Sequence, residues 1–133
     1  MSDNGMDYPL YAFQMSKDIY IVCHGMTDDG QHRVCEISPE GKIRDSYGGL
    51  RGKGPDQLDL PIGAALTKDG QHILVADYVN ARVLLLKRQP LRLHRVLIDE
   101  EHTGAQPTCL TLIDDTGRLC VGLSTQGVLI YKF

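Results

Sequence analysis

Short runs of apolar residues alternate with turn-forming residues along most of the chain. No stretch keeps a 3.6-residue period over three helical turns, so the pattern predicts an all-β protein. The clearest unit lies within residues 54–87. Its expected strands at 63–66, 73–76 and 82–86 are separated by a polar turn and by a tight turn that carries Asp77 and Asn80.

Weaker copies of this unit lie on both sides of it, and repeats of this length are typical of solenoids, propellers or arrays. We expect one domain over residues 1–133, with sheets at about 8–50, 58–100 and 106–133. The first and third sheets have these expected strands: 10–15, 19–24, 33–37 and 42–47, then 109–112, 119–122 and 128–132. The third unit stops after its third strand, so we expect it to lack an outermost strand.

The composition of the strands predicts a radial array of sheets. The apolar runs at 19–23, 73–76 and 83–86 are continuous rather than alternating, which is typical of strands buried on both faces. The first strand of the middle unit, at 63–66, consists of small residues, as a crowded central axis requires.

The middle unit contains a set of residues at characteristic positions: Gly54, Leu58, Pro61-Ile62-Gly63, Asp69-Gly70, Val75-Ala76-Asp77 and Asn80-Ala81-Arg82-Val83. In this pattern it resembles the NHL repeat, a β-propeller unit at the C-terminus of many tripartite-motif (TRIM-NHL) ubiquitin ligases. The first unit keeps Arg33-Val34 but has a longer loop before it, and the third lacks the Asp/Asn/Arg set.

The resemblance implies four-stranded blades with the first strand innermost, usually six to a ring. The chain would then form three blades, which is half of a six-bladed NHL-type propeller. Such a half-ring exposes the flanks of its first and third blades, which carry Val, Leu, Ile and Tyr side chains. Since monomers rarely expose patches of this kind, we predict a homodimer that closes a six-bladed ring.

Composition limits the possible partners and compartments. The net charge of -3 gives no overall attraction to phosphate, and no apolar run approaches the roughly 18 residues of a membrane span. The N-terminus is polar and lacks the layout of a signal peptide, so we expect a cytoplasmic location. Cys23, Cys35, Cys109 and Cys120 lie within apolar runs without CxxC spacing, so we expect buried thiols rather than a zinc site.

The polar residues of the middle unit are expected to have structural roles. Asp77 and Asn80 can bind the amides of their turn, and Arg82 can pair with Asp77 across it. The glycine-rich stretch 48–55 is not a phosphate-binding loop, because Gly54 and Pro55 follow Lys53 where Ser or Thr and a helix are needed. We expect this stretch to be a flexible connection between blades.

No catalytic or metal-binding set is visible. The expected inner strands carry neither carboxylates nor histidines, so we expect no cofactor, no metal and no enzymatic activity. The basic residues of the middle unit are expected on its outer rim, where they oppose edge-to-edge pairing: Lys87, Arg88, Arg92 and Arg95.

The sequence therefore predicts a non-enzymatic protein-interaction scaffold that binds protein partners through its loops. The expected contact residues share one loop face: Met26, Arg51, Lys53 and Tyr78. The alternative is an RNA-binding NHL propeller, which the acidic residues of this face disfavour: Asp28, Asp29, Asp56, Asp59, Asp99, Glu100 and Glu101. A third hypothesis is the substrate-recognition part of a larger tripartite-motif ligase, and no membrane partner is expected.

Overall fold

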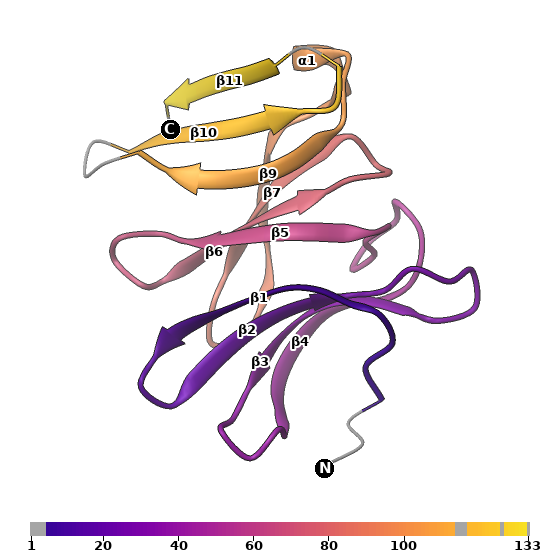
Figure 1. Cartoon of the computed structure of the whole chain (residues 1–133), viewed down its shortest axis with the longest axis vertical. Helices are drawn as coiled ribbons and strands as arrows, with labels where there is room; N and C mark the ends of the chain where they lie inside the picture. The colour runs from indigo at the N-terminus through magenta and orange to yellow at the C-terminus, as the bar shows by residue number, and fades with distance from the viewer. Residues whose placement is uncertain (1–4, 114–116, 126, 133) are drawn as a thin grey trace.

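The computed structural model describes residues 5–113, 117–125 and 127–132, whose strands form three antiparallel sheets (Figure 1). The first sheet has the order β1-β2-β3-β4, with β1 at Pro9–Ser16, β2 at Ile19–His24, β3 at Gln31–Ile37 and β4 at Ile43–Leu50. The second has the order β5-β6-β7-β8, with β5 at Pro61–Leu66, β6 at His72–Asp77, β7 at Arg82–Lys87 and β8 at Arg92–Ile98.

The third sheet has the order β11-β10-β9, with β9 at Pro107–Leu112, β10 at Arg118–Leu123 and β11 at Gly127–Lys132. The predicted all-β fold is confirmed, and so is the division into two four-stranded sheets and one that has three strands in the described part of the chain. No helix among the described residues is long and apolar enough to cross a membrane.

The first strand of each sheet lies toward a common axis. β5 contacts both β1 and β9, and Figure 1 shows β9, β5 and β1 one below the other. A Cβ added at Gly63 of β5 would lie 3.8 Å from the Cα of Cys109 in β9, so small residues here let neighbouring inner strands approach closely.

Two apolar cores lie between the sheets. Ile21, Val34, Ile73 and Leu84 belong to the core between the first and second sheets, and Leu74, Val83, Leu119 and Val121 to the core between the second and third. The second sheet is thus covered on both faces, which explains the continuous apolar runs of β6 and β7.

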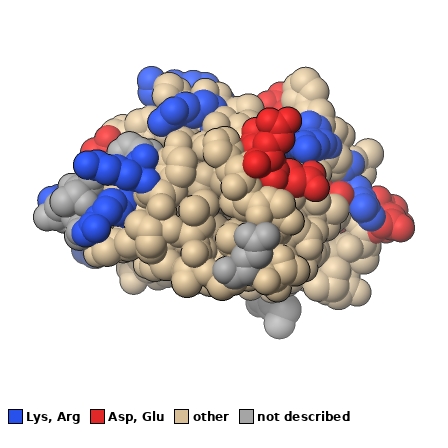
Figure 2. Space-filling view, turned by 90° about the horizontal axis from the view of Figure 1, so that it is seen from above, with Lys and Arg blue, Asp and Glu red and all other residues tan. Residues whose placement is uncertain are grey.

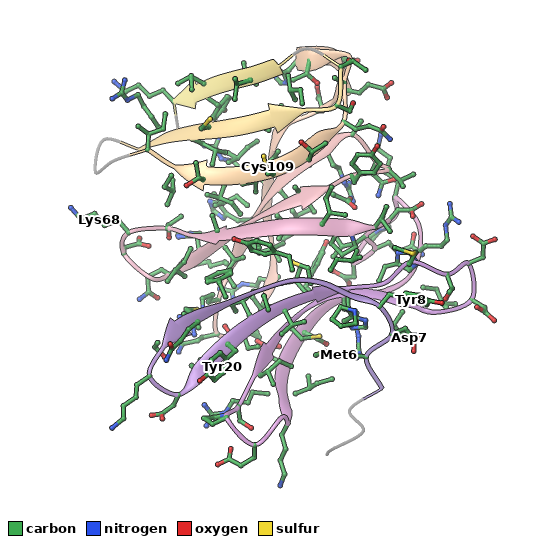
Figure 3. All side chains as sticks on the ribbon, viewed as in Figure 1. Met6, Asp7, Tyr8, Tyr20, Lys68 and Cys109 are labelled. Atoms are coloured by element: carbon green, nitrogen blue, oxygen red, sulfur yellow. The ribbon has the colours of Figure 1, made fainter. Side chains whose placement is uncertain are left out.

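The same expectation is wrong for the run at 19–23 in β2. Ile21 and Cys23 are buried against the second sheet, but Tyr20 on the opposite face is 37% exposed (Figure 3). The reason is that no described sheet covers the outer face of the first one. Cys109, expected to be buried, is likewise exposed, because it lies on the outer face of the third sheet.

A short helix, α1 (Glu100–Thr103), was not expected from the sequence. The Asp99 side chain caps it by accepting from the backbone N–H of His102, and Gly104 ends it in the left-handed conformation at φ 63°. A helix of one turn leaves no period in the sequence, so only its capping residues could have indicated it.

The expectation of a flexible loop over 48–55 is also wrong at its beginning. β4 continues to Leu50, and Gly48 pairs with Arg33 of β3. Gly48 has φ +116°, and a Cβ at this position would lie 2.2 Å from the backbone oxygen of His32. Glycine here extends the strand because it permits a backbone contact that a side chain would block.

Candidate functional site

The connections at one end of the three sheets form a common loop face. It consists of the β2–β3 loop (25–30), the β4–β5 connection (51–60), the β6–β7 turn (78–81), the β8–β9 connection (99–106) and the described part of the β10–β11 turn (124–125). Backbone hydrogen bonds join neighbouring connections, including Tyr78 N to Leu60 O at 3.2 Å. The expected contact residues belong to this face.

Asp77, at the end of β6, is fully buried and forms the centre of a polar network. Its Oδ1 accepts from the backbone N–H of Asp59 at 2.7 Å, and its Oδ2 accepts from Asn80 Nδ2 at 2.8 Å and Arg82 Nε at 2.7 Å. Burial raises the pKa of Asp77, and these three donors act in the opposite direction.

Asn80 and Arg82 extend this network to the β4–β5 connection. Asn80 Nδ2 also donates to the Gly52 carbonyl at 2.8 Å, and Arg82 Nη2 donates to the Gln57 carbonyl at 3.0 Å. Both residues are buried, and every one of these contacts stays within the chain. The network therefore attaches a connection without regular secondary structure to the second sheet.

Two buried histidines, His24 and His32, hold the same end of the first sheet. His32 Nδ1 accepts from the backbone N–H of Leu60 at 3.0 Å, so its Nε2 carries the proton that reaches the Thr27 carbonyl at 2.8 Å. His24 Nε2 accepts from Arg33 Nε at 2.9 Å. Burial, and next the charge of Arg33, lowers the pKa of His24.

The four expected contact residues differ in how accessible they are to a partner. Met26 is 50% exposed, Lys53 is exposed and Tyr78 is half-buried. Arg51 forms ion pairs with Asp28 of the β2–β3 loop and with Asp59, the latter at 3.2 Å. Asp59, and next Asp28, raises the pKa of Arg51 above its usual value. Arg51 thus joins two loops of the face with most of its donors engaged.

A pocket of about 250 Å³ opens between the second and third sheets on this face. It is lined by the β6–β7 turn, the β8–β9 connection and the β10–β11 turn, through these residues: Val79, Ala81, Glu100, Gly104, Ala105, Gln106, Ser124 and Thr125. The sequence predicted Tyr78 as a contact residue, and Tyr78 directly precedes Val79 in the chain. The remaining lining residues lie far apart in the sequence, and no local motif connects them.

The basic cluster of the middle unit lies at the opposite end, around the β7–β8 turn. Arg88 is committed to the fold, because its Nε donates to Glu36 at 2.6 Å and its Nη1 to the Gly70 carbonyl at 2.7 Å. Arg92 Nη1 donates to the nearby Pro90 carbonyl at 2.7 Å. This cluster therefore contributes contacts between the first two sheets in addition to a charged rim.

The described residues contain no group of three His, Cys, Asp or Glu side chains that could hold a metal ion. All four cysteines are free thiols, and Cys23 and Cys35 are buried. Burial raises the pKa of the Cys35 thiol to about 11 and that of Cys23 further still, so neither is a ready nucleophile.

Comparison with known proteins identifies the architecture. No family model matches the sequence, and no curated protein matches it either. Among solved structures, the chain is similar to the C-terminal WD40 domain of Sif2, with a TM-score of 0.67 over 94% of its length at 16% sequence identity. The chain spans 34% of the length of that WD40 chain. This likeness supports propeller blades in general rather than the NHL type, and the chain accordingly has a β-propeller fold in which the three sheets are blades 1, 2 and 3.

Proposed function

We propose that the chain is a non-enzymatic protein-interaction module of the NHL type, which associates with a second copy through its two outer flanks. The observation that carries this proposal is the outer face of blade 3. Val128 and Ile130 of β11 are 63% and 53% exposed there. They pair with Gly122 and Cys120 of β10, and Gly122 pairs with the exposed Cys109, so one continuous face of small and apolar residues is open.

Figure 2 shows the end of the molecule occupied by blade 3, with uncharged surface across its centre and charged side chains mainly around it. The outer face of blade 1 is also partly apolar, with Tyr20 beside the half-buried Val22 of β2 and Ala12 of β1. Pairing blade 3 of one copy with blade 1 of another, twice around a two-fold axis, buries both faces. Burial of apolar area then provides the driving force for association.

The test is the oligomeric state of the 133-residue chain by sedimentation velocity at micromolar concentration. We expect a species of twice 14.8 kDa, and a monomer for the double variant V128D/I130D. The matched control is L93D/V96D on β8. It introduces the same two negative charges at exposed apolar residues that lie away from the flanks. A wild-type monomer, or a dimer that survives V128D/I130D, contradicts self-association.

Protein rather than RNA is the partner that we propose for the loop face. The guanidinium group of Arg51 on this face is bound by the carboxylates of Asp28 and Asp59, and phosphate would have to displace these. Titration with a random single-stranded RNA pool at low salt is expected to give no salt-dependent binding. We also propose a cytoplasmic location, for which four unpaired thiols are typical.

A further inference from the structure

The pocket between blades 2 and 3 has a mixed polar and apolar lining that includes one carboxylate. Val79, Ala81 and Ala105 provide the apolar surface, and Val79 is exposed. Glu100 provides the carboxylate, at the first position of α1. Ser124 and Thr125 provide hydroxyl groups from the β10–β11 turn. At about 250 Å³, the pocket is smaller than the roughly 300–1,000 Å³ of sites for drug-sized ligands and suits one long side chain.

No described side chain pairs with the carboxylate of the pocket. The Glu100 carboxylate makes no hydrogen bond or ion pair to any described residue, whereas its neighbour Asp99 is bound to His102. No Lys or Arg is among the described residues that line the pocket. Figure 2 shows acidic side chains, with basic side chains beside them, on the side of the molecule where Figure 1 places α1.

The junction between blades 1 and 2 holds a cation beside its carboxylates on the loop face. There the guanidinium of Arg51, which directly follows β4, lies against Asp28 of the β2–β3 loop and Asp59 of the β4–β5 connection. A cation from within the chain thus neutralises the carboxylates at this junction. At the second junction the carboxylate is present, the space is open, and a cation is missing from the lining.

We propose that the pocket between blades 2 and 3 binds a lysine or arginine side chain of a partner polypeptide. The aliphatic stem lies along Val79, Ala81 and Ala105, and the charged head reaches Glu100, an arrangement that long basic side chains adopt readily. The proposal rests on the proposed protein-interaction function and gives that function a partner chemistry.

The experiment is a titration of the ¹⁵N-labelled full chain followed by NMR, with three blocked amino acids as probes: N-acetyl-lysine methylamide, N-acetyl-arginine methylamide and N-acetyl-norleucine methylamide. We expect saturable shifts at the amides of Val79, Gly104, Ala105 and Ser124 for the two basic probes, with dissociation constants of about 1 mM or weaker. The ratio of the lysine and arginine constants identifies the preferred head group. Norleucine, which has a similar stem without the charge, should bind at least about fivefold more weakly.

Two variants that change the same charge form the matched pair. E100Q should weaken binding of the basic probes about fivefold, and E101Q, whose side chain does not line the pocket, should leave it unchanged. Absence of saturable shifts, equal binding of norleucine, or equal effects of the two variants overturns the proposal. The spectra themselves report whether each variant is folded. Sedimentation of the same samples shows separately whether self-association holds, so failure of the pocket is distinguishable from failure of the proposed function.

Discussion

Replacement of Asp77 by alanine tests whether the polar network on the loop face is structural. The change removes the acceptor of three hydrogen bonds of 2.7 to 2.8 Å and leaves the Arg82 guanidinium, in a residue only 8% exposed, without its counter-ion. Breaking a buried pair from one side costs about 3–5 kcal/mol. Because domains are stable by only about 5–15 kcal/mol, the variant should lose a large share of its stability. The melting temperature should fall by about 10–15 °C.

The assay is urea unfolding at pH 7, followed by far-ultraviolet circular dichroism, on the wild type and the four variants D77A, R82L, D77A/R82L and D29A. The double variant D77A/R82L should be less destabilised than the sum of its two single changes, because it removes the unpaired buried charge as well. Asp29→Ala, at an exposed carboxylate of the β2–β3 loop, is the matched control and should change stability by no more than about 0.5 kcal/mol.

The result that would refute this reasoning is a D77A variant whose free energy of unfolding falls by less than about 1 kcal/mol. If such a variant also lost a partner that the wild type binds, the carboxylate would be a binding group and the network would have to open in the native state. A simple loss of stability with binding preserved at low temperature supports the structural role.

Two further predictions concern the first blade. The pKa of His24 is lowered in the folded chain, so as pH decreases its imidazole is protonated in the unfolded chain before it is protonated in the folded one. The free energy of unfolding should therefore be largest above about pH 6.5 and decrease below it. Melting temperatures from pH 5.5 to 8 should show this dependence, with a smaller slope for His24→Gln. Gly48→Ala should destabilise by about 2 kcal/mol or more in urea unfolding, because its Cβ would meet backbone at 2.2 Å. Gly70→Ala, at φ +72° with open space, should cost less, and equal costs would contradict the clash.

The strands were predictable from the sequence because their burial is repetitive. Ile73, Leu74, Val75 and Ala76 are all fully buried, and a run of this kind bounded by turn residues permits little else than a central strand. The pairing of Arg82 with Asp77 was predicted and is present. The prediction that Asp77 and Asn80 bind the amides of their own turn is wrong, because their side chains bind the backbone of Asp59 and Gly52 in the β4–β5 connection.

The remaining features depend on what lies opposite a residue in space. Tyr20 and Cys109 belong to apolar runs like those of blade 2. They are nevertheless exposed, because no described blade covers them. The pocket could not be predicted for a related reason. Val79, Glu100 and Ser124 come from three connections, and only the stacking of blades 2 and 3 brings these together.

An apolar core lies at each of the two blade junctions, and the first junction has directional polar contacts in addition. This difference bears on where binding can vary. At the first junction, directional polar contacts lie at both ends. On the loop face the backbone N–H of Asp59 donates to Asp77 and that of Leu60 donates to His32. At the opposite end Arg88 pairs with Glu36. Such contacts fix the relative position of two blades, and a substitution in them leaves a buried group unpaired.

At the second junction an apolar core that includes Leu74, Leu119 and Val121 lies beside the open pocket. Apolar packing is non-directional, and it does not depend on which side chains line the rim of the pocket. Residues such as Glu100 and Thr125 can therefore change without loss of the contact between blades 2 and 3. We accordingly expect partner specificity to be adjusted at the second junction, whereas the first is constrained by the fold.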